Sequence, residues 1–194
     1  MEATDAAPTG LWEMEQALIS LGINLDDQNF INTPARWLKY MREFTQKYDP
    51  RADLSKTFDE PVDDIYSHAM IVQQNIPYQA VCAHHLVPVL GRSHVGYVPK
   101  AKVVGLSKLT RLVWGYSHEQ PSLQEDIGNK VADALMEHLD AEGAICVISA
   151  EHGCMACRGV AQQEIITTTA SVRGLFKENV AARQEFYSLV NLGR

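Results

Sequence analysis

The sequence predicts an α+β fold with an antiparallel sheet, preceded by N-terminal helices. The first observation is the order of elements: two helices, several strands, two helices, further strands and one closing helix follow one another along the chain. Grouping of this kind favours an antiparallel sheet, because a parallel sheet requires regular alternation of strand and helix. The second observation is composition: 194 residues with 46% hydrophobic and 21% charged side chains are typical of a globular protein with a sizeable core.

The N-terminal part is predicted to be an arm followed by helices. Residues 1–10 are small and polar and include a proline and a glycine, so we expect a flexible arm. From Leu11 to Gly22, hydrophobic residues recur at three- and four-residue steps, the spacing of one helix face. Thr33 followed by proline is a typical helix start. We therefore assign residues 11–62 to an N-terminal helical region that ends in an acidic, proline-containing connection.

The remaining residues, 63–194, are predicted to form the main domain. Short runs rich in β-branched residues, separated by polar residues, proline or glycine, predict strands. These runs comprise residues 69–72, 78–82, 86–90, 94–98, 144–150 and 163–176. Hydrophobic residues at helical spacing predict three helices, which begin near Ser107, after Ser122 and at Val180.

The net charge of −7 limits the partners that the chain can bind. A negative overall field argues against extended nucleic acid and anionic membranes, so a small anionic substrate has to meet a local cluster of basic residues. No run approaches the roughly 18 apolar residues of a membrane span, and residues 1–10 lack the apolar stretch of a signal peptide. We therefore expect a cytoplasmic protein with reduced cysteines.

Two segments about seventy residues apart carry cysteine and histidine at metal-ligand spacing: Cys82-x-x-His85 and Cys154-x-x-Cys157. Thiolates and imidazoles from two tight turns suit zinc well. One alternative is that these cysteines are small buried residues without a metal. Another is a structural zinc site closed by four ligands, and Cys157 is the residue that distinguishes it from a catalytic site with three protein ligands.

Two further histidines favour the catalytic interpretation of this metal-ligand pattern. His84 and His152 each lie within two residues of a proposed ligand. A structural zinc site does not require them, whereas imidazoles beside a zinc-bound water could transfer protons near neutral pH. The pattern therefore indicates hydrolysis.

A basic cluster follows the predicted strands. Lys108 and Arg111 lie three positions apart on one face of a helix that is predicted to begin at Ser107. Free backbone N–H groups, the positive end of the helix dipole and two cations together can bind a phosphate. Taken alone, the two cations are better explained as the solvated face of an amphipathic helix. Arg158, just after the second metal segment, adds another positive charge.

Gln124 and Glu125 begin the next predicted helix. An amide and a carboxylate side by side could accept hydrogen bonds from the N1–H and amino groups of guanine. Ser122 and Glu125 also have the spacing of a capping box, in which the carboxylate ties down the helix start. From these residues alone we favour the cap.

From about Thr33 to Leu192, the chain resembles the GTP cyclohydrolase I family. The resemblance rests on several separate motifs in the same order. They are Cys82-Ala-His-His85, Gly105-Leu-Ser-Lys-Leu-Thr-Arg111, Leu123-Gln-Glu125, His152-Gly-Cys-Met-Ala-Cys-Arg158 and the Thr-rich strand toward Gly174-Leu-Phe176.

The resemblance implies a role for each matching residue. Zinc would be bound by Cys82, His85 and Cys154, which leaves Cys157 outside the site and one position open for water. His84 and His152 would be the active-site histidines. The guanine would contact Gln124 and Glu125, and the triphosphate would lie near Ser107, Lys108, Arg111 and Arg158.

The reaction implied by the resemblance is hydrolytic opening of the imidazole ring of GTP. A zinc-polarised water attacks C8, His152 exchanges a proton with the ring nitrogen, formate leaves, and ring closure gives 7,8-dihydroneopterin triphosphate. The implied architecture is the tunnelling fold, with residues 63–194 as the catalytic domain. Subunits of this fold form a homo-oligomer, usually a decamer, with active sites between subunits, so Gln124 and Glu125 would serve a neighbour's zinc.

The chain departs from the family pattern at three places. The family usually has glutamate at the position of Ala83 and arginine at the position of Asp126, and one extra residue stands between Arg111 and Gln124. Two alternative functions therefore stay open: a zinc-dependent hydrolase of the same fold acting on another purine or formamide-type substrate, and a structural zinc-binding assembly protein.

Overall fold

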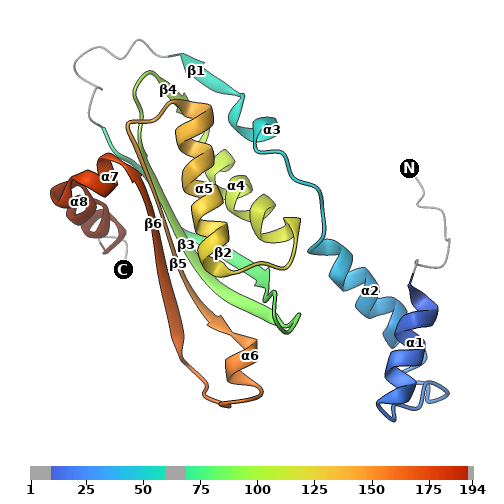
Figure 1. Cartoon of the computed structure of the whole chain (residues 1–194). Coiled ribbons are helices and arrows are strands. Elements are labelled where there is room, and N and C mark those ends of the chain that lie inside the picture. The colour runs from blue at the N-terminus through green and yellow to red at the C-terminus, as the bar shows by residue number, and fades with distance from the viewer. Residues whose placement is uncertain (1–9, 60–68, 192–194) are drawn as a thin grey trace. The chain divides into compact units, whose positions relative to one another are not determined.

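The computed structural model describes residues 10–59 and 69–191, which divide into two compact units, Met1–Gln46 and Lys47–Arg194. In the first unit, α1 (Leu11–Ser20) packs against α2 (Thr33–Glu43) (Figure 1). Both helices were predicted, and a proline in the first turn of α2 accounts for its start. Of the predicted arm, residues 1–10, only the last residue lies within the described part of the chain.

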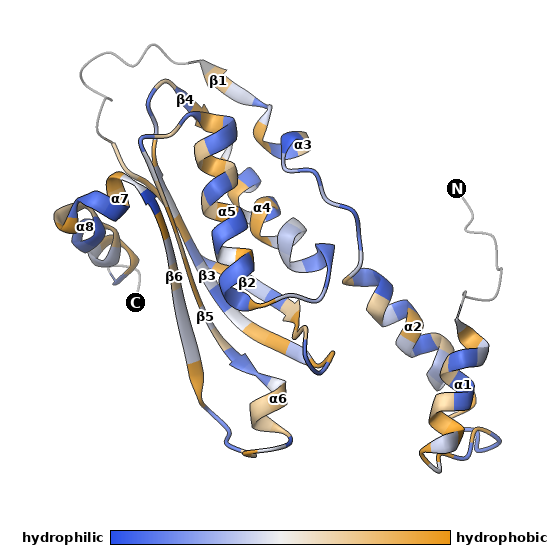
Figure 2. Ribbon diagram, viewed as in Figure 1, coloured by the Kyte–Doolittle hydropathy of each residue, from blue (hydrophilic) through white to orange (hydrophobic). Residues whose placement is uncertain are grey.

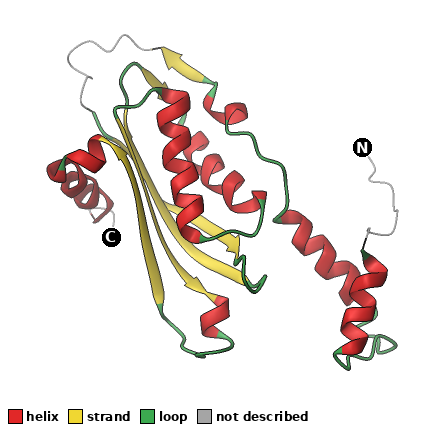
Figure 3. Cartoon of the chain, viewed as in Figure 1, coloured by secondary structure: helices red, strands yellow, loops and turns green. Residues whose placement is uncertain are grey.

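The second unit is built around a four-stranded antiparallel sheet with the order β2-β3-β5-β6. Its strands are β2 (Ile71–Val81), β3 (Pro88–Val98), β5 (Gly143–His152) and β6 (Ile166–Gly174). Two long helices, α4 (Leu106–Glu119) and α5 (Gln124–Leu139), cover one face of the sheet (Figure 1). The α+β class is therefore confirmed, with helices and strands segregated as Figure 3 shows.

Short elements complete the second unit. They are α3 (Arg51–Leu54), β1 (Thr57–Asp59), β4 (Lys102–Val104), α6 (Gly153–Ala156) and α7 (Leu175–Glu178), followed by the closing helix α8 (Val180–Asn191). β1 pairs with β4, and α3 packs against α4 and α5. Residues 47–59 therefore belong with the sheet, and the two units divide earlier than the predicted boundary at 62/63, which lies outside the described residues.

The core lies on both faces of the sheet. The larger cluster fills the space between the sheet and α4 and α5, where Tyr78, Tyr97 and Leu135 are fully buried. A smaller cluster under α8 contains Phe176 and Phe186. Figure 2 shows hydrophobic residues along α4, α5 and α8 and along the strands of the sheet. No helix in the described part of the chain is long and apolar enough to cross a membrane.

Two predicted pairs of short strands are single long strands in the structure. β2 continues through a polar interruption because the chain accommodates it as a bulge between Gln73 and Ile76, with Asn75 at a φ of +58°. β3 continues through Gly91, where a Cβ atom would lie 2.1 Å from the backbone oxygen of Ser149 in β5. A glycine that we interpreted as a strand boundary therefore permits close approach of two strands instead.

Two predicted helix caps are wrong. α4 begins at Leu106 with Gly105 as its N-cap, so Ser107 lies inside the first turn. The N-cap of α5 is Leu123, and no side chain caps this helix. The hydroxyl of Ser122 donates to the backbone oxygen of Gln120 instead. The capping box therefore does not form, and capping does not account for Glu125.

Candidate active site

Three predicted zinc ligands converge where β2 and β5 end. After Val81, the chain turns back into β3. The backbone N–H of Cys82 donates to the oxygen of Val87, and that of Leu86 donates to the oxygen of Cys82. Leu86 completes the turn with a φ of +53°. Cys154 is the second residue of α6, which begins directly after β5. Within residues 10–59 and 69–191, Cys82, His85 and Cys154 are the one group of metal-binding side chains whose donor atoms all lie within 4.8 Å of one another.

This donor set fits zinc. Two thiol sulfurs and one imidazole nitrogen are typical zinc ligands, and a tetrahedral ion would separate such atoms by about 3.6–3.8 Å. The Sγ atom of Cys82 lies 3.9 Å from Nδ1 of His85, close to that spacing. Burial and the neighbouring Cys82 thiol raise the pKa of the Cys154 thiol, and Arg158 acts in the opposite direction.

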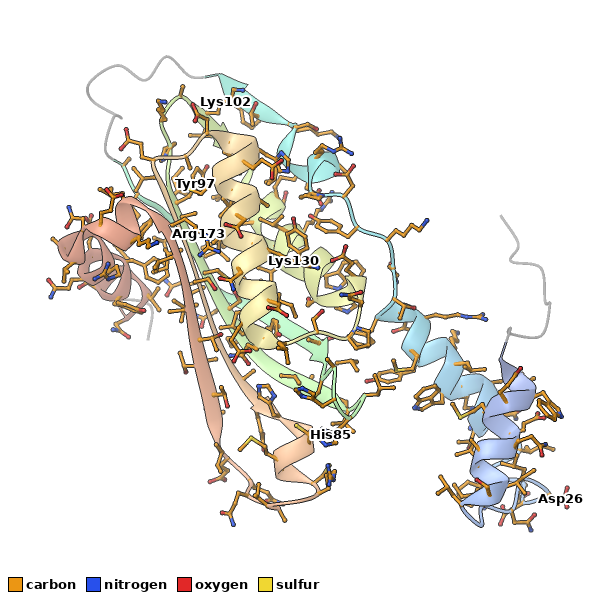
Figure 4. The ribbon with its side chains drawn as sticks, viewed as in Figure 1. Asp26, His85, Tyr97, Lys102, Lys130 and Arg173 are labelled. Atoms are coloured by element: carbon orange, nitrogen blue, oxygen red, sulfur yellow. The ribbon has the colours of Figure 1, made fainter. Side chains whose placement is uncertain are left out.

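Cys157 lies outside this group. Its side chain is exposed, and its thiol donates to the backbone oxygen of Gly153 over 2.8 Å. The described residues therefore offer three ligands on one side of the metal position, which is the arrangement of catalytic zinc sites and leaves a coordination position open. His85 lies at the end of the sheet beside α6 in Figure 4.

A cavity of about 220 Å³ opens beside the three ligands. Its lining comes from the ends of β2, β3 and β5, the turn before α5 and the first residues of α5. The lining residues are Tyr78, Cys82, His84, Val89, Ser122, Leu123, Gln124, Glu125, His152 and Cys154. The cavity therefore combines two ligand cysteines, both predicted active-site histidines and the predicted guanine-binding pair.

The two histidines have different surroundings. His84 is exposed, and its Nδ1 lies 4.0 Å from Sγ of Cys82. His152 is partly buried as the last residue of β5, and its Nε2 lies 3.0 Å from Oε1 of Gln124. The orientation of His152 is thus tied to the start of α5, whereas His84 faces the open side of the cavity.

Gln124 and Glu125 lie beside their own chain's metal ligands. This placement differs from the expectation that the pair serves a neighbour's zinc, and the reason is that α5 starts directly after Ser122, which bridges to Cys82. The two side chains diverge: Gln124 is 3% exposed and bonded within the protein, whereas Glu125 is exposed to the cavity. Glu125 therefore presents a carboxylate for a ligand.

The predicted phosphate-binding cations lie elsewhere. α4 is 14 residues long, or about 21 Å, and Lys108 and Arg111 stand in its first two turns, beside β4. Figure 4 shows Lys102 of β4 and His85 at opposite ends of the sheet. Within the described residues, none of Ser107, Lys108, Arg111 or Arg158 lines the cavity. Ser107, Lys108 and Arg111 therefore lie apart from the metal ligands of their own chain, whereas Arg158 follows α6 and acts electrostatically on Cys154.

Lys108 and Arg111 share a carboxylate that sequence reasoning missed. Asp53 of α3, 9% exposed, accepts a hydrogen bond from Nζ of Lys108 over 3.0 Å and lies 3.7 Å from Nη1 of Arg111. The hydroxyl of Tyr48 donates to the other oxygen of Asp53. Burial and the Asp53 charge raise the pKa of Tyr48. No sequence signal marked Asp53, because it stands in a stretch that we interpreted as a connection.

Two departures from the family pattern lie near the cavity. Ala83 is exposed in the turn between two cavity-lining residues, and Asp126 is exposed in the first turn of α5 beside Glu125. An acidic pair at a helix start is electrostatically favourable. The substitution at Asp126 therefore suits the helix as well as adding negative charge next to the cavity.

Two solved structures match about half of this chain. One is the archaeosine synthase QueF-Like in the apo form, with 9% identity, a TM-score of 0.43 and coverage of 56% of this chain and 94% of that one. The other is dihydroneopterin aldolase from Burkholderia thailendensis bound to guanine, with 10% identity, a TM-score of 0.37 and coverage of 55% and 91%. These likenesses are too distant to assign a property to this chain.

Several relatives that match nearly the whole chain are named GTP cyclohydrolase 1. The protein from Corynebacterium glutamicum strain ATCC 13032 is 41% identical over 91% of this chain and 89% of its own length. Those from Pelotomaculum thermopropionicum and Mycobacterium tuberculosis are 40% and 42% identical, over 89% and 91% of this chain and 90% and 87% of their own lengths. The sequence model of GTP cyclohydrolase I matches residues 12–191. The chain therefore belongs to the GTP cyclohydrolase I family.

Proposed function

We propose that this chain is a zinc-dependent GTP cyclohydrolase I that converts GTP and water to 7,8-dihydroneopterin triphosphate and formate. The observation that carries this proposal is the single cavity that places Glu125 and His152 beside Cys82 and Cys154. A purine needs an acceptor for its N1–H and amino groups, and hydrolysis of its imidazole ring needs a metal and a proton carrier. The cavity offers the carboxylate of Glu125, the imidazole of His152 and two cysteines that could hold a metal.

Cys82, His85 and Cys154 would hold the zinc ion. When bound, zinc makes hydroxide available near neutral pH and stabilises negative charge that develops on the attacked carbon. Side chains of the protein would orient the substrate and transfer protons. Glu125 orients the purine through its N1–H and amino groups, and His152 and His84 move protons between water and the ring nitrogen.

We infer that the triphosphate is bound by a second copy of the chain. Lys108 and Arg111 stand in the first two turns of α4, and within the described residues neither they nor Ser107 line the cavity of their own chain, which supports this inference. β2 and β6 form the two edges of the sheet, and edges of this kind pair with strands of another subunit. A ring-shaped homo-oligomer, as in the predicted decamer, would bring the cations of one copy to the cavity of the next.

Arg158 would contact the same triphosphate from the chain that holds the metal. It is exposed just after α6 and acts electrostatically on Cys154 of its own chain. A guanidinium in this position would approach the ligand from the metal side, and the second copy would supply the other cations.

The test is the product formed from GTP by the purified, zinc-loaded protein. We expect formate and, after oxidation, a fluorescent pterin in equal amounts. His152→Ala is the matched variant: it should retain zinc while turnover collapses, because none of the three ligands is touched. Zinc-loaded native protein that yields neither product from GTP would exclude this function.

A second candidate is a hydrolase of the same fold with another purine or formamide-type substrate. The exposed acid at Asp126 favours it, because a second negative charge next to Glu125, which lines the cavity, suits a less anionic ligand. Formate release from a panel of purine nucleosides and nucleotides distinguishes the two candidates. The structural zinc alternative requires a fourth ligand, and among the described residues Cys157 does not join the group.

A further inference from the structure

The carboxamide of Gln124 is held in one orientation. Gln124 is 3% exposed, and its side chain reaches from the start of α5 to the sheet. Its Nε2 lies 3.0 Å from the backbone oxygen of Ile148 in β5, 3.1 Å from that of Thr167 in β6 and 3.0 Å from Oγ1 of Thr169. Three oxygens therefore surround the amide nitrogen.

The opposite orientation of this amide is excluded by its neighbours. Backbone carbonyl oxygens accept hydrogen bonds and cannot donate them. Exchanging the nitrogen and oxygen of Gln124 would set Oε1 against the carbonyl oxygens of Ile148 and Thr167, so that two acceptors would face a third acceptor in place of a donor. Leaving such acceptors without a donor is unfavourable. Oε1 must therefore face the remaining neighbour, Nε2 of His152, at 3.0 Å.

An oxygen in that position determines where His152 carries its proton. Because an amide oxygen only accepts, Nε2 of His152 has to be the donor of this hydrogen bond. In a neutral imidazole, one ring nitrogen carries the proton and the other has a lone pair. A nitrogen that donates a hydrogen bond is the protonated one, so the lone pair must be on the other nitrogen. Within the described part of the chain, Nδ1 of His152 makes no hydrogen bond. The lone pair is therefore on Nδ1.

We propose that Gln124 is a positioning residue that holds His152 in the tautomer protonated at Nε2, so that Nδ1 is the atom that exchanges protons with the reactants. Gln124 then does not bind the purine through its side chain, contrary to the role that the family resemblance implies for it. Glu125 is left as the side chain of the pair that recognises guanine. The structural part stands alone, whereas the assignment of Nδ1 to proton transfer rests on the proposed function.

The proton transfer balances at this one atom. Nδ1 takes a proton from the water that adds to the purine carbon and returns it to the ring nitrogen as the carbon–nitrogen bond breaks. His152 ends in the state in which it began, and Nε2 keeps its proton and its hydrogen bond to Gln124 throughout.

The direct test is the ¹⁵N chemical shift pattern of the His152 ring in the uniformly labelled, zinc-loaded protein. His152→Asn identifies the signals by their loss. We expect a proton on Nε2 and the lone-pair shift on Nδ1. The reverse pattern in the native protein would overturn the proposal, and this measurement requires neither a folded Gln124 variant nor activity toward GTP.

Two variants separate positioning from purine binding. Gln124→Met removes the acceptor for His152 at similar length, and Thr169→Val removes one neighbour of the same amide while leaving Oε1 in place. We expect Gln124→Met to mix the tautomers and lower kcat about 10- to 100-fold with little change in KM, the size typical of lost supporting contacts in metal sites. Thr169→Val should keep the native tautomer and kcat within about threefold. A raised KM with unchanged kcat and tautomer in Gln124→Met would show purine binding instead.

Discussion

The two ends of the sheet differ in how far one chain completes them. At the end with α6, Cys82, His85 and Cys154 already share one small volume, and Gln124 holds His152 beside it. At the end with β4, Lys108 and Arg111 share the single carboxylate of Asp53. One chain thus brings its own metal ligands and His152 together. Lys108 and Arg111, which would bind phosphate, lie at the other end of the sheet and are partly neutralised by Asp53.

This difference follows from the two kinds of interaction. A metal site requires donor atoms in a fixed geometry, and short turns after two neighbouring strands provide it. Charge attraction acts over longer distances and tolerates looser geometry, so cations on another copy of the chain can serve. Without a bound phosphate, Asp53 provides the ion-pair partner of the largely buried Lys108, since an unpaired buried charge is costly.

The largest effect should come from the metal end. Cys154→Ser should lose zinc and all detectable turnover because one of three ligands is replaced by a much weaker one. Cys157→Ser is the matched variant, three residues away, and should keep both. Metal content by elemental analysis of each purified variant is the measurement. Loss of zinc in Cys157→Ser would instead favour the structural four-ligand site.

The next effect should come from the guanine carboxylate. Glu125→Gln replaces an acceptor by a group with one donor end, and we expect kcat/KM for GTP to fall about 10- to 100-fold, the worth of a charged hydrogen bond. Asp126→Asn, the adjacent acid, should change kcat/KM by less than about threefold. Steady-state assays of both variants give the comparison. Equal losses in the two would mean that overall charge, not a specific contact, sets affinity.

The cation end should show its largest effect in stability. Asp53→Ala leaves the 13% exposed Lys108 side chain without its partner, and we expect the free energy of unfolding to fall by about 3 kcal/mol. The exposed pair of Asp49 and Arg51 is the control: Asp49→Ala should leave the free energy of unfolding nearly unchanged. Urea unfolding of both variants measures the difference. A cost at Asp53 no greater than that at Asp49 would remove the distinction between the two pairs.

The smallest effect concerns a buried cysteine between the two ends. Burial raises the pKa of the Cys146 thiol from its ordinary 9.0 to about 12. The unfolded chain therefore releases this proton first, so its contribution to stability is complete below about pH 9 and is lost as pH rises toward 12. Cys146→Ala should flatten the alkaline fall of the melting temperature and leave zinc content unchanged. An unchanged alkaline slope would contradict the burial argument.

The metal end could be predicted well from the sequence because its geometry is local. Cys82 and His85 lie in one short turn between β2 and β3, and Cys154 stands two residues after β5, so spacing alone restricts where their donor atoms can meet. Strand interruptions were harder, because a bulge at Asn75 and a close approach at Gly91 depend on the partner strand.

Contacts between distant segments could not be predicted. The partners of Gln124 are 24, 28, 43 and 45 positions away and become neighbours only through the register of β5 and β6. Asp53 and Lys108 are 55 positions apart and meet because α3 packs against α4. Both contacts bear on a predicted role. Gln124, predicted to bind guanine, contacts His152, and Lys108, predicted to bind phosphate, forms an ion pair with Asp53.

The division of one site between two copies is tested most directly by complementation. Cys154→Ser lacks the metal end and Lys108→Met lacks a phosphate-binding cation, so each should be inactive alone. When both are co-expressed with different tags and purified as mixed oligomers, about one quarter of the sites should pair an intact metal end with an intact cation end. We predict restored formate release from GTP in the mixture. Mixed oligomers that stay inactive would contradict the account.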